Sequence, residues 1–210
     1  MPDAVFPGLA RTCARSVKAI RTEVMTVWST TRTEWADWPE TALYSKDKGD
    51  AWNVLPFVHT FPGHDPSKTT WVPHACALCP VLTRFLQGVP DLRTALVSVM
   101  SPNMQLKPHR GWASLSNHVL RCHLPLVLPE GADADGFPWT GVVVQGKTQF
   151  HTNHDLIVFD DSMSHFAFNT HATQSRIVLI FDIARPHTVP VGTAVGDCTE
   201  ELLSFMDFFK

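Results

Sequence analysis

One segment in the middle of the chain places a cation and an imidazole side by side. Residues 119–128 read Val-Leu-Arg-Cys-His-Leu-Pro-Leu-Val-Leu. Strand alternation puts Arg121 and His123 on one face and Cys122 and Leu124 on the other. Both Arg121 and His123 can donate hydrogen bonds to a carboxylate, so this pattern is typical of an anion-binding strand. The alternative is a polar outer face in contact with solvent.

A second pattern starts two consecutive strands with a histidine and an arginine. Residues 159–165 read Phe-Asp-Asp-Ser-Met-Ser-His, so one strand ends at Asp160 and Asp161 and His165 opens the next; Arg176 opens another strand eleven residues later. A jelly roll can in this way place a metal ligand and a carboxylate anchor in one cavity, because the guanidinium binds carboxylates bidentately. Alone, His165 also fits an ordinary core or surface histidine. The two aspartates are interpreted as turn formers, as partners that orient His165, or as both.

A third candidate, His109, follows a strand and a loop that begin near Ser98. Each of these residues would be unremarkable by itself. Their joint occurrence in one order is what indicates a site. The order along the chain is Ser98, His109, Arg121, His123, His165 and Arg176.

The elements that must position these residues are short strands. Apolar runs that end in Gly, Pro, Asn or Asp recur at residues 94–100, 119–128, 141–145, 156–159 and 176–183. Several short strands with turn signals between them predict an all-β sandwich or barrel, here a double-sheet domain of jelly-roll type.

Helices are expected before these strands. One apolar stripe has a helical 4-3-4-3 spacing and consists of Cys13, Val17, Ile20, Val24 and Val27. A second helix is expected over residues 80–88, where Pro80 suits the first helical position and Val81, Leu82, Phe85 and Leu86 share a face. We therefore expect one domain over residues 1–210, with a helical portion to about residue 90, a β core over about 91–186 and a tail over 187–210.

The composition restricts the class of protein. The formal net charge is −3 at pH 7, which gives no positive field to attract nucleic acid. No apolar run is long enough to span a membrane, and the first residues lack the apolar core of a secretory signal. Five cysteines with one closely spaced pair favour a reducing compartment. We expect a cytoplasmic protein whose partner is a small molecule or a peptide, with no nucleic acid and no membrane.

Two further groups are interpreted as structural. His74, Cys76 and Cys79 resemble half of a zinc site, but no second Cys/His pair lies at zinc-finger spacing, so core thiols are expected. His151 and His154 lie in a polar turn and are expected at the surface.

Taken together, the motifs resemble the aspartyl/asparaginyl β-hydroxylase family. They are Pro-His-Arg-Gly at 108–111, Arg-Cys-His-Leu at 121–124, Phe-Asp-Asp-Ser-x-x-His at 159–165 and Arg-Ile-Val-Leu-Ile-x-Asp at 176–182. That family consists of Fe(II)/2-oxoglutarate-dependent oxygenases. The resemblance implies a mainly β fold, namely a double-stranded β-helix (jelly-roll, cupin-like) core with N-terminal helices packed against it. It also implies a dioxygenase that uses Fe(II), 2-oxoglutarate and O₂ to hydroxylate an unactivated carbon.

The resemblance implies the metal ligands. His109 corresponds to the first metal histidine of the family and His165 to the second, and these two are the expected catalytic centre. Two imidazoles with open coordination positions suit non-haem Fe(II). The usual carboxylate two residues after the first histidine is replaced here by Gly111, as in the resembling family, where solvent is expected to fill the place. A small residue at this position also occurs where a halide binds iron, so a halogenase variant is an alternative.

The resemblance also implies how 2-oxoglutarate is held. Arg176 and Ser98 correspond to the pair that grips its distal carboxylate. Arg121 and His123 correspond to the pair near its metal-chelating end. The same residues could serve a non-catalytic jelly-roll module that binds a metal or an oxo acid, and release of succinate would distinguish the two.

The sequence departs from the family pattern where a substrate would lie. A basic residue of the family is Val119 here, Pro125 interrupts a His-Leu-Gly-Leu motif, and Trp112 follows Gly111. Losing a cation argues against an acidic peptide substrate. The β-carbon of an Asp/Asn-like residue, a small amino-acid derivative, a lipid-like chain and a different peptide all stay open.

Overall fold

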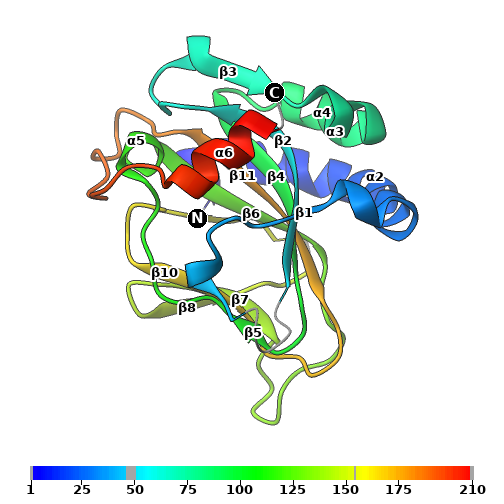
Figure 1. Cartoon of the computed structure of the whole chain (residues 1–210). Coiled ribbons are helices and arrows are strands. Elements are labelled where there is room, and N and C mark those ends of the chain that lie inside the picture. Colours follow the sequence, from blue (N-terminus) through cyan, green and yellow to red (C-terminus); the bar gives the residue numbers. More distant parts are fainter. Residues whose placement is uncertain (1, 46–50, 154, 209–210) are drawn as a thin grey trace.

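The computed structural model describes residues 2–45, 51–153 and 155–208, and its centre is a sandwich of two antiparallel sheets (Figure 1). The large sheet consists of β1 (Ala36–Asp37), β2 (Trp52–Thr60), β4 (Leu92–Met100), β11 (Arg176–Ala184), β6 (Val119–Val127) and β9 (Ile157–Phe159) in that spatial order, with β3 (Thr69–Trp71) paired to β2. The small sheet consists of β5 (Met104–Gln105), β10 (His165–Asn169), β7 (Thr140–Val144) and β8 (Lys147–Phe150) in that order.

From β4 onward the chain passes back and forth between the two layers. Strands β4, β6, β9 and β11 belong to the large sheet, and β5, β7, β8 and β10 belong to the small one. This arrangement is a double-stranded β-helix, which confirms the predicted jelly-roll core. All five strands expected from apolar runs are present within two residues of their predicted ends.

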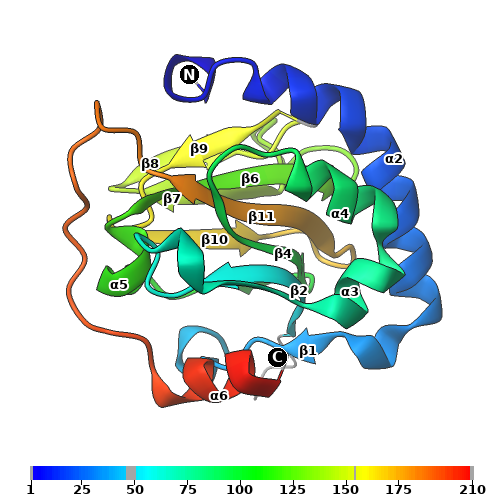
Figure 2. The same cartoon turned by 90° about the horizontal axis from the view of Figure 1, so that it is seen from above.

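Helices from the first ninety residues cover the outer face of the large sheet (Figure 2). The α-helices are α1 (Pro2–Val5), α2 (Leu9–Thr30), α3 (Pro73–Leu78), α4 (Pro80–Gln87), α5 (Ala113–Ser116) and α6 (Glu200–Phe208). Short 3₁₀ turns are Arg32–Glu34, Thr41–Leu43 and Pro66–Lys68. The predicted packing of N-terminal helices against the β core is therefore confirmed.

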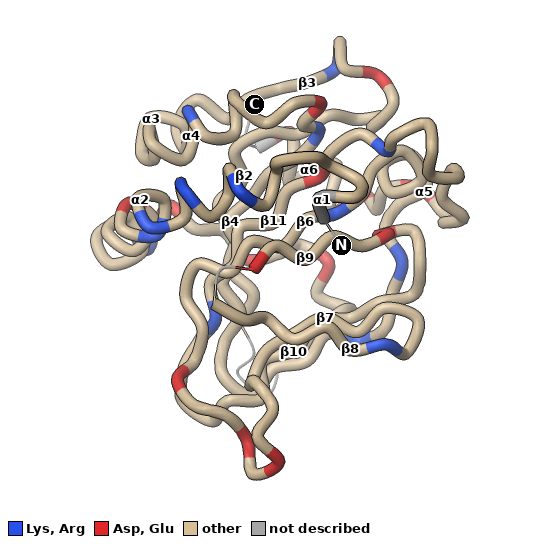
Figure 3. The backbone as a smooth tube through the Cα atoms, turned by 180° about the vertical axis from the view of Figure 1, so that it is seen from behind, with Lys and Arg blue, Asp and Glu red and all other residues tan. Residues whose placement is uncertain are grey.

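Helix α2 forms because one side of it is apolar over its whole length. All five residues of the predicted stripe are buried, with Ile20 and Val24 fully so. The stripe packs on β6 residues such as Cys122 and Leu124, which point away from the cavity between the sheets. Lysine and arginine residues lie on the opposite, exposed side of α2 (Figure 3).

Helix α4 begins at a proline and is capped from a neighbouring helix. The carboxylate of Glu23, on α2, accepts hydrogen bonds from the backbone N–H groups of Val81 (2.9 Å) and Leu82 (2.8 Å). These are donors that the first helical turn leaves without partners. The prediction for this helix is confirmed except at Val81, which is 38% exposed instead of sharing the buried face, because it lies at the capped end.

Two parts of the chain differ from the expectation. The first ninety residues also supply β2, a nine-residue strand next to β4. Nearly every residue of β2 is buried and Pro56 interrupts it, so the segment lacks the alternation by which strands are recognised. The expected tail contains a helix, α6, which lies against the core. The division into portions itself stays a prediction.

No helix in the described ranges is both long and apolar enough to cross a membrane.

Candidate active site

The predicted co-substrate residues lie on neighbouring strands of the large sheet, and strand pairing puts them on one face. Asp182 on β11 pairs with Arg121 on one side and Thr94 on the other, and Ile180 pairs with His123 and Leu96. Residues directly opposite each other share a face, as do residues two apart along a strand. The face toward the small sheet therefore carries Thr94, Leu96, Ser98, Arg121, His123 and Arg176. The predicted anion-binding face of β6 is confirmed as an inner face: His123 is 3% exposed.

The two predicted metal histidines come from the small sheet and face each other. His109 follows β5 and His165 opens β10, and their backbones pair through N–H···O bonds of 2.9 and 2.8 Å. Their ring centroids are 4.4 Å apart. Each ring donates its Nδ1 proton to a carbonyl two residues earlier, His109 to Lys107 (2.8 Å) and His165 to Met163 (2.9 Å). Both Nε2 atoms are left as electron-pair donors, which is how ligand imidazoles are oriented.

The protonation of His109 suits the same use. Burial, followed by the nearby His165, lowers the pKa of His109 to about 4. The imidazole is therefore neutral at pH 7 and has a lone pair to offer a metal.

A carboxylate lies beside the histidine pair although residue 111 is glycine. Oδ1 of Asp161 is 3.3 Å from Nε2 of His165, and Asp161 is fully buried. A Cβ atom placed on Gly111 would be 1.9 Å from Oδ2 of Asp161. The space that a side chain at position 111 would take is thus filled by the carboxylate of Asp161. Asp160 fits the predicted turn former, since it accepts from Ser162 N–H at 3.0 Å. Asp161 lies on the Nε2 side of His165, whereas the carbonyl of Met163 holds the ring at Nδ1.

These groups fit a non-haem iron with few protein ligands. Among the residues that the structure describes, no set of three or more His, Cys, Asp or Glu side chains is arranged to hold a metal. Two imidazoles leave the other coordination positions of a non-haem iron open for water and a co-substrate. The thiols of Cys76 and Cys79 form no such set with His74, and burial raises the pKa of Cys79 to about 12, which leaves it a neutral core thiol.

Arg121 is held by two acids of the chain. Its Nε and Nη2 donate to Asp182 at 2.9 and 3.0 Å, and Nη1 contacts Asp161. Thr94 Oγ1 donates to the same Asp182. Burial by itself would lower the pKa of Arg121, but Asp161 and Asp182 outweigh it and raise the pKa. Arg121 thereby fixes Asp161 in position, and its predicted contact with 2-oxoglutarate stays a prediction.

Ser98 and Arg176 lie deeper on the inner face. Ser98 is fully buried and its Oγ accepts a hydrogen bond from Trp52 Nε1 at 3.0 Å. Arg176 is 1% exposed, yet its Nε and Nη1 have no hydrogen-bond acceptor among the described residues. Burial lowers the pKa of Arg176 to about 10, so it still carries its charge at pH 7. A buried cation with unsatisfied donors is costly unless an anion joins it.

The prediction from the sequence was wrong for one residue of the site. His151 was expected at the surface but is 1% exposed, and its Nε2 is 3.3 Å from Nδ1 of His123. Its Nδ1 is 3.2 Å from Oγ1 of Thr140. The N–H of His151 bonds to the carbonyl of Thr140, which extends the β7–β8 ladder by one residue and turns the ring inward. The other histidine of that expectation, His154, lies outside the described residues.

The Thr140–His151–His123 chain can set the tautomer of His123. When Thr140 donates to His151 and His151 donates to His123 Nδ1, the Nε2 of His123 carries its proton and can donate to a carboxylate. Burial, and then His151, lowers the pKa of His123 well below its usual value. His123 is therefore a neutral donor at pH 7.

We expect His151→Ala to weaken 2-oxoglutarate binding roughly tenfold, because His123 loses the partner that fixes its donor. His151→Gln should recover part of the loss through its amide. Titration calorimetry of 2-oxoglutarate into Mn(II)-loaded protein measures the effect. The exposed His187→Ala is the control. Equal affinity in the His151→Ala variant and the wild type would remove His151 from the site.

Gly111→Ala is expected to lower the free energy of unfolding by roughly 1–3 kcal/mol, since the new methyl group collides with Asp161 and with Ser116. Chemical denaturation of the metal-free protein measures it. In an Asp161→Ala background the same substitution should cost less, because only the collision with Ser116 remains. An equal penalty in both backgrounds would show that Asp161 does not fill this space.

Known proteins resemble this chain in sequence. The chain is 33% identical over 112 residues to an ornithine lipid ester-linked acyl 2-hydroxylase of Rhizobium tropici, covering 53% of this chain and 37% of that protein. It is 29% identical over 154 residues to human aspartate beta-hydroxylase domain-containing protein 2, covering 68% of this chain and 38% of that protein. The chain thus spans little more than a third of the length of these curated relatives.

A solved structure of a prolyl-4-hydroxylase from Pseudomonas putida aligns over 82% of this chain and 88% of that chain, with a TM-score of 0.45 and 16% identity. The family model for aspartyl/asparaginyl beta-hydroxylase matches residues 14–186, which include every site residue described above. The chain therefore belongs to the aspartyl/asparaginyl β-hydroxylase family.

Proposed function

We propose that this protein is an Fe(II)- and 2-oxoglutarate-dependent dioxygenase that hydroxylates an unactivated carbon. His109 and His165 are the metal ligands. Arg176 and Ser98 bind the distal carboxylate of 2-oxoglutarate, and His123, with Arg121 beside it, lies at the chelating end. The proposed substrate is a small molecule or a peptide, and the cytoplasmic setting rests on the cysteine composition alone.

The observation that carries this proposal is the buried guanidinium of Arg176, which lies on the same inner face as His123 and whose Nε and Nη1 find no acceptor among the described residues. An anion is needed there, and an anion that also reaches the histidine pair must have a second metal-binding end. A dicarboxylate with a 2-oxo group meets both requirements.

Iron and 2-oxoglutarate, when bound, supply the oxidising chemistry. The chain supplies orientation and exclusion of water. Carbonyls of Lys107 and Met163 hold the two imidazoles, and Arg121 holds Asp161 next to them. Asp161, whose oxygens lie in no well-directed hydrogen bond among the described residues, would lie beside a metal held by His109 and His165 and could accept a proton there.

The same carboxylate separates hydroxylation from halogenation. A halide on iron would need the space beside Gly111, and that space holds the negative charge of Asp161. Because that carboxylate fills the space, little room is left there for a halide, which supports the hydroxylase reading.

The test is formation of succinate from 2-oxoglutarate by purified protein with Fe(II), ascorbate and O₂. Succinate should form slowly without substrate and faster with it. Binding of 2-oxoglutarate without any succinate would instead support the alternative of a non-catalytic oxo-acid-binding module. Absence of binding to the Fe(II)-loaded protein would refute the proposal.

A further inference from the structure

A second cavity lies directly behind His151. This cavity, which we call the outer cavity, has a volume of ≈ 460 Å³, and Arg21, Trp139, Thr140, His151 and Asn153 are among its lining residues. Arg21 and Asn153 are exposed, so the outer cavity is open to solvent. Thr140 and His151, by contrast, are each 1% exposed. These two buried residues are therefore the floor of the outer cavity.

Strand pairing turns both floor residues toward the inside of the sandwich. On β7, Thr140 shares a face with Val142, which packs on Phe159 of the large sheet. His151 lies opposite Thr140, because its N–H bonds to the Thr140 carbonyl, and so its ring points the same way. Nε2 of this ring is 3.3 Å from Nδ1 of His123. One imidazole therefore stands between the outer cavity and the proposed co-substrate site.

The ring of His151 also lies close to Arg176. Burial lowers the pKa of His151 well below its usual value, and the charge of Arg176 is the next cause. Burial, then His151, and then Arg176 lower the pKa of His123. Because such effects weaken with distance, His151 is near both residues. It flanks the gap between His123 and Arg176, where the chain of 2-oxoglutarate is proposed to lie.

Other walls near Arg176 are backed by packed protein. Met100, which pairs with Arg176 across the sheet, is fully buried in an apolar cluster. Asn169 is fully buried as well, and its amide nitrogen donates to two backbone carbonyls at 2.9 Å. Side chains in such surroundings cannot give way without loss of packing or hydrogen bonds. His151 differs from them, since open space lies behind it.

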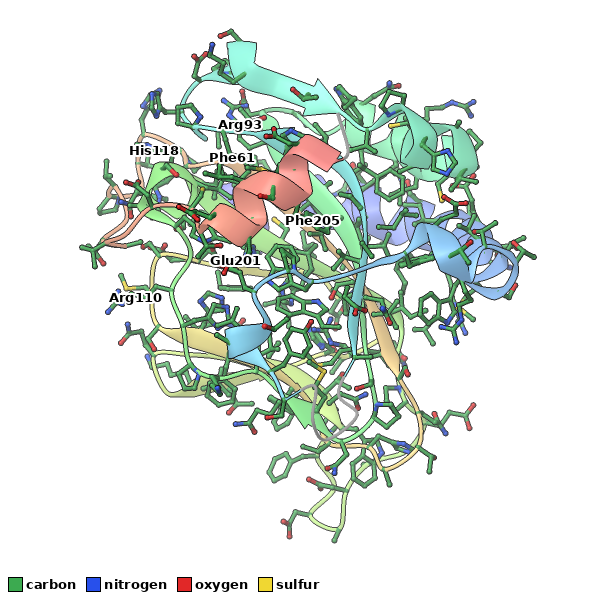
Figure 4. All side chains as sticks on the ribbon, viewed as in Figure 1. Phe61, Arg93, Arg110, His118, Glu201 and Phe205 are labelled. Carbon is green, nitrogen blue, oxygen red and sulfur yellow. The ribbon has the colours of Figure 1, made fainter. Side chains whose placement is uncertain are left out.

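The proposed substrate side of the site is separate from His151. The cavity that reaches His109 adjoins a cavity under α6, because the two share lining residues such as Arg121. Phe61 and Phe205, both labelled in Figure 4, line the cavity under α6. His151 is not among the lining residues that the structure describes for either cavity. A change at His151 should therefore act on the co-substrate and not on the substrate.

We propose that His151 determines which 2-oxo diacids this protein accepts as co-substrate. This inference rests on the proposed function, because it requires 2-oxoglutarate between the metal histidines and Arg176. Both ends of that chain are fixed, one at His109 and His165 and the other at Arg176, so a chain with one more methylene must bend sideways. In the wild type the imidazole of His151 fills that space. Without the imidazole the longer chain bends toward the outer cavity, where water and the hydroxyl of Thr140 can solvate it.

The test compares 2-oxoglutarate with 2-oxoadipate, which is one methylene longer. Each is titrated by calorimetry into Mn(II)-loaded protein. The wild type should bind 2-oxoadipate more weakly than 2-oxoglutarate by roughly fivefold or more, because an extra methylene in a packed site is costly. In His151→Ala the ratio of the two dissociation constants should fall by roughly tenfold or more, since 2-oxoglutarate loses a partner of His123 while 2-oxoadipate gains room.

The controls separate selectivity from stability. Asn153→Ala, on the exposed side of the outer cavity, should keep the wild-type ratio. His151→Gln keeps a donor and much of the volume and should stay near the wild-type ratio. If His151→Ala fails to fold, His151→Asn shortens the same wall and should shift the ratio in the same direction. A merely structural role would weaken both acids equally, so an unchanged ratio would overturn the proposal. Equal affinity of the wild type for the two acids would do so too.

The outcome is distinguishable from that of the proposed function. If neither acid binds to the metal-loaded wild type, the proposed function and this inference are both wrong. If 2-oxoglutarate binds and yields succinate while the ratio does not respond to His151, only the role of His151 in selectivity is wrong.

Discussion

His109→Ala is expected to abolish Fe(II)-dependent turnover and to weaken Fe(II) binding by more than about 100-fold. Loss of a partner that merely orients a ligand costs 10- to 100-fold, so loss of one of two protein ligands should cost more. The fold should persist, because the backbone pairing of His109 with His165 does not use the imidazole. Anaerobic Fe(II) titration and succinate formation measure the two effects.

The control for this variant is His118→Ala, which removes a partly exposed histidine whose ring packs on His64, outside the site. It should bind Fe(II) and turn over as the wild type does. Wild-type iron affinity in the His109→Ala variant would show that the metal lies elsewhere.

Arg176→Met should weaken 2-oxoglutarate binding by roughly 10- to 150-fold, since a hydrogen-bonded charge contributes about 1.5–3 kcal/mol. Its effect on stability should have the opposite sign. Most buried truncations destabilise by about 2–5 kcal/mol. Here the ligand-free protein should unfold at an equal or higher denaturant concentration, because the variant removes a buried cation with unsatisfied donors.

The two readouts for Arg176 are anaerobic titration of 2-oxoglutarate into Fe(II)-loaded protein and urea unfolding of the metal-free protein. Arg176→Lys should restore binding only in part, because an ammonium cannot reproduce the bidentate contact. A variant that binds 2-oxoglutarate normally would take Arg176 out of the site. A variant that is much less stable would show that Arg176 has a structural partner.

Alternation of polar and apolar residues correctly predicted which residues of β6 face the site, because one side of that strand is polar. Arg121 and His123 could be placed opposite Cys122 and Leu124 because β6 alternates. Strand β2 could not be recognised in the same way, since both of its faces are buried and the chain gives no alternation there. Periodicity reports the contrast between two faces, and β2 has no such contrast.

The residues that sequence reasoning missed act through tertiary contacts. His151 follows a polar turn, and only its pairing with Thr140 carries it inward. The space beside Gly111 is another case, because the aspartate that fills it lies fifty residues away along the chain. Helix α6 was expected only as part of the tail. Its apolar residues Leu202, Phe205 and Met206 line a cavity whose other walls come from distant parts of the chain, so the sequence alone gives no sign of their role.

The division of the site between the layers has a mechanical consequence. His165 belongs to the small sheet and His109 pairs with it, whereas Ser98, His123 and Arg176 belong to the large sheet. If a metal and 2-oxoglutarate bind as proposed, they would connect the two sheets as a non-covalent cross-link. We expect amide hydrogen exchange in β10 and β11 to slow together when both are bound, and Arg176→Met to uncouple the two strands. The two sheets would then be most rigid in the state with metal and 2-oxoglutarate bound, which is the state that receives the substrate.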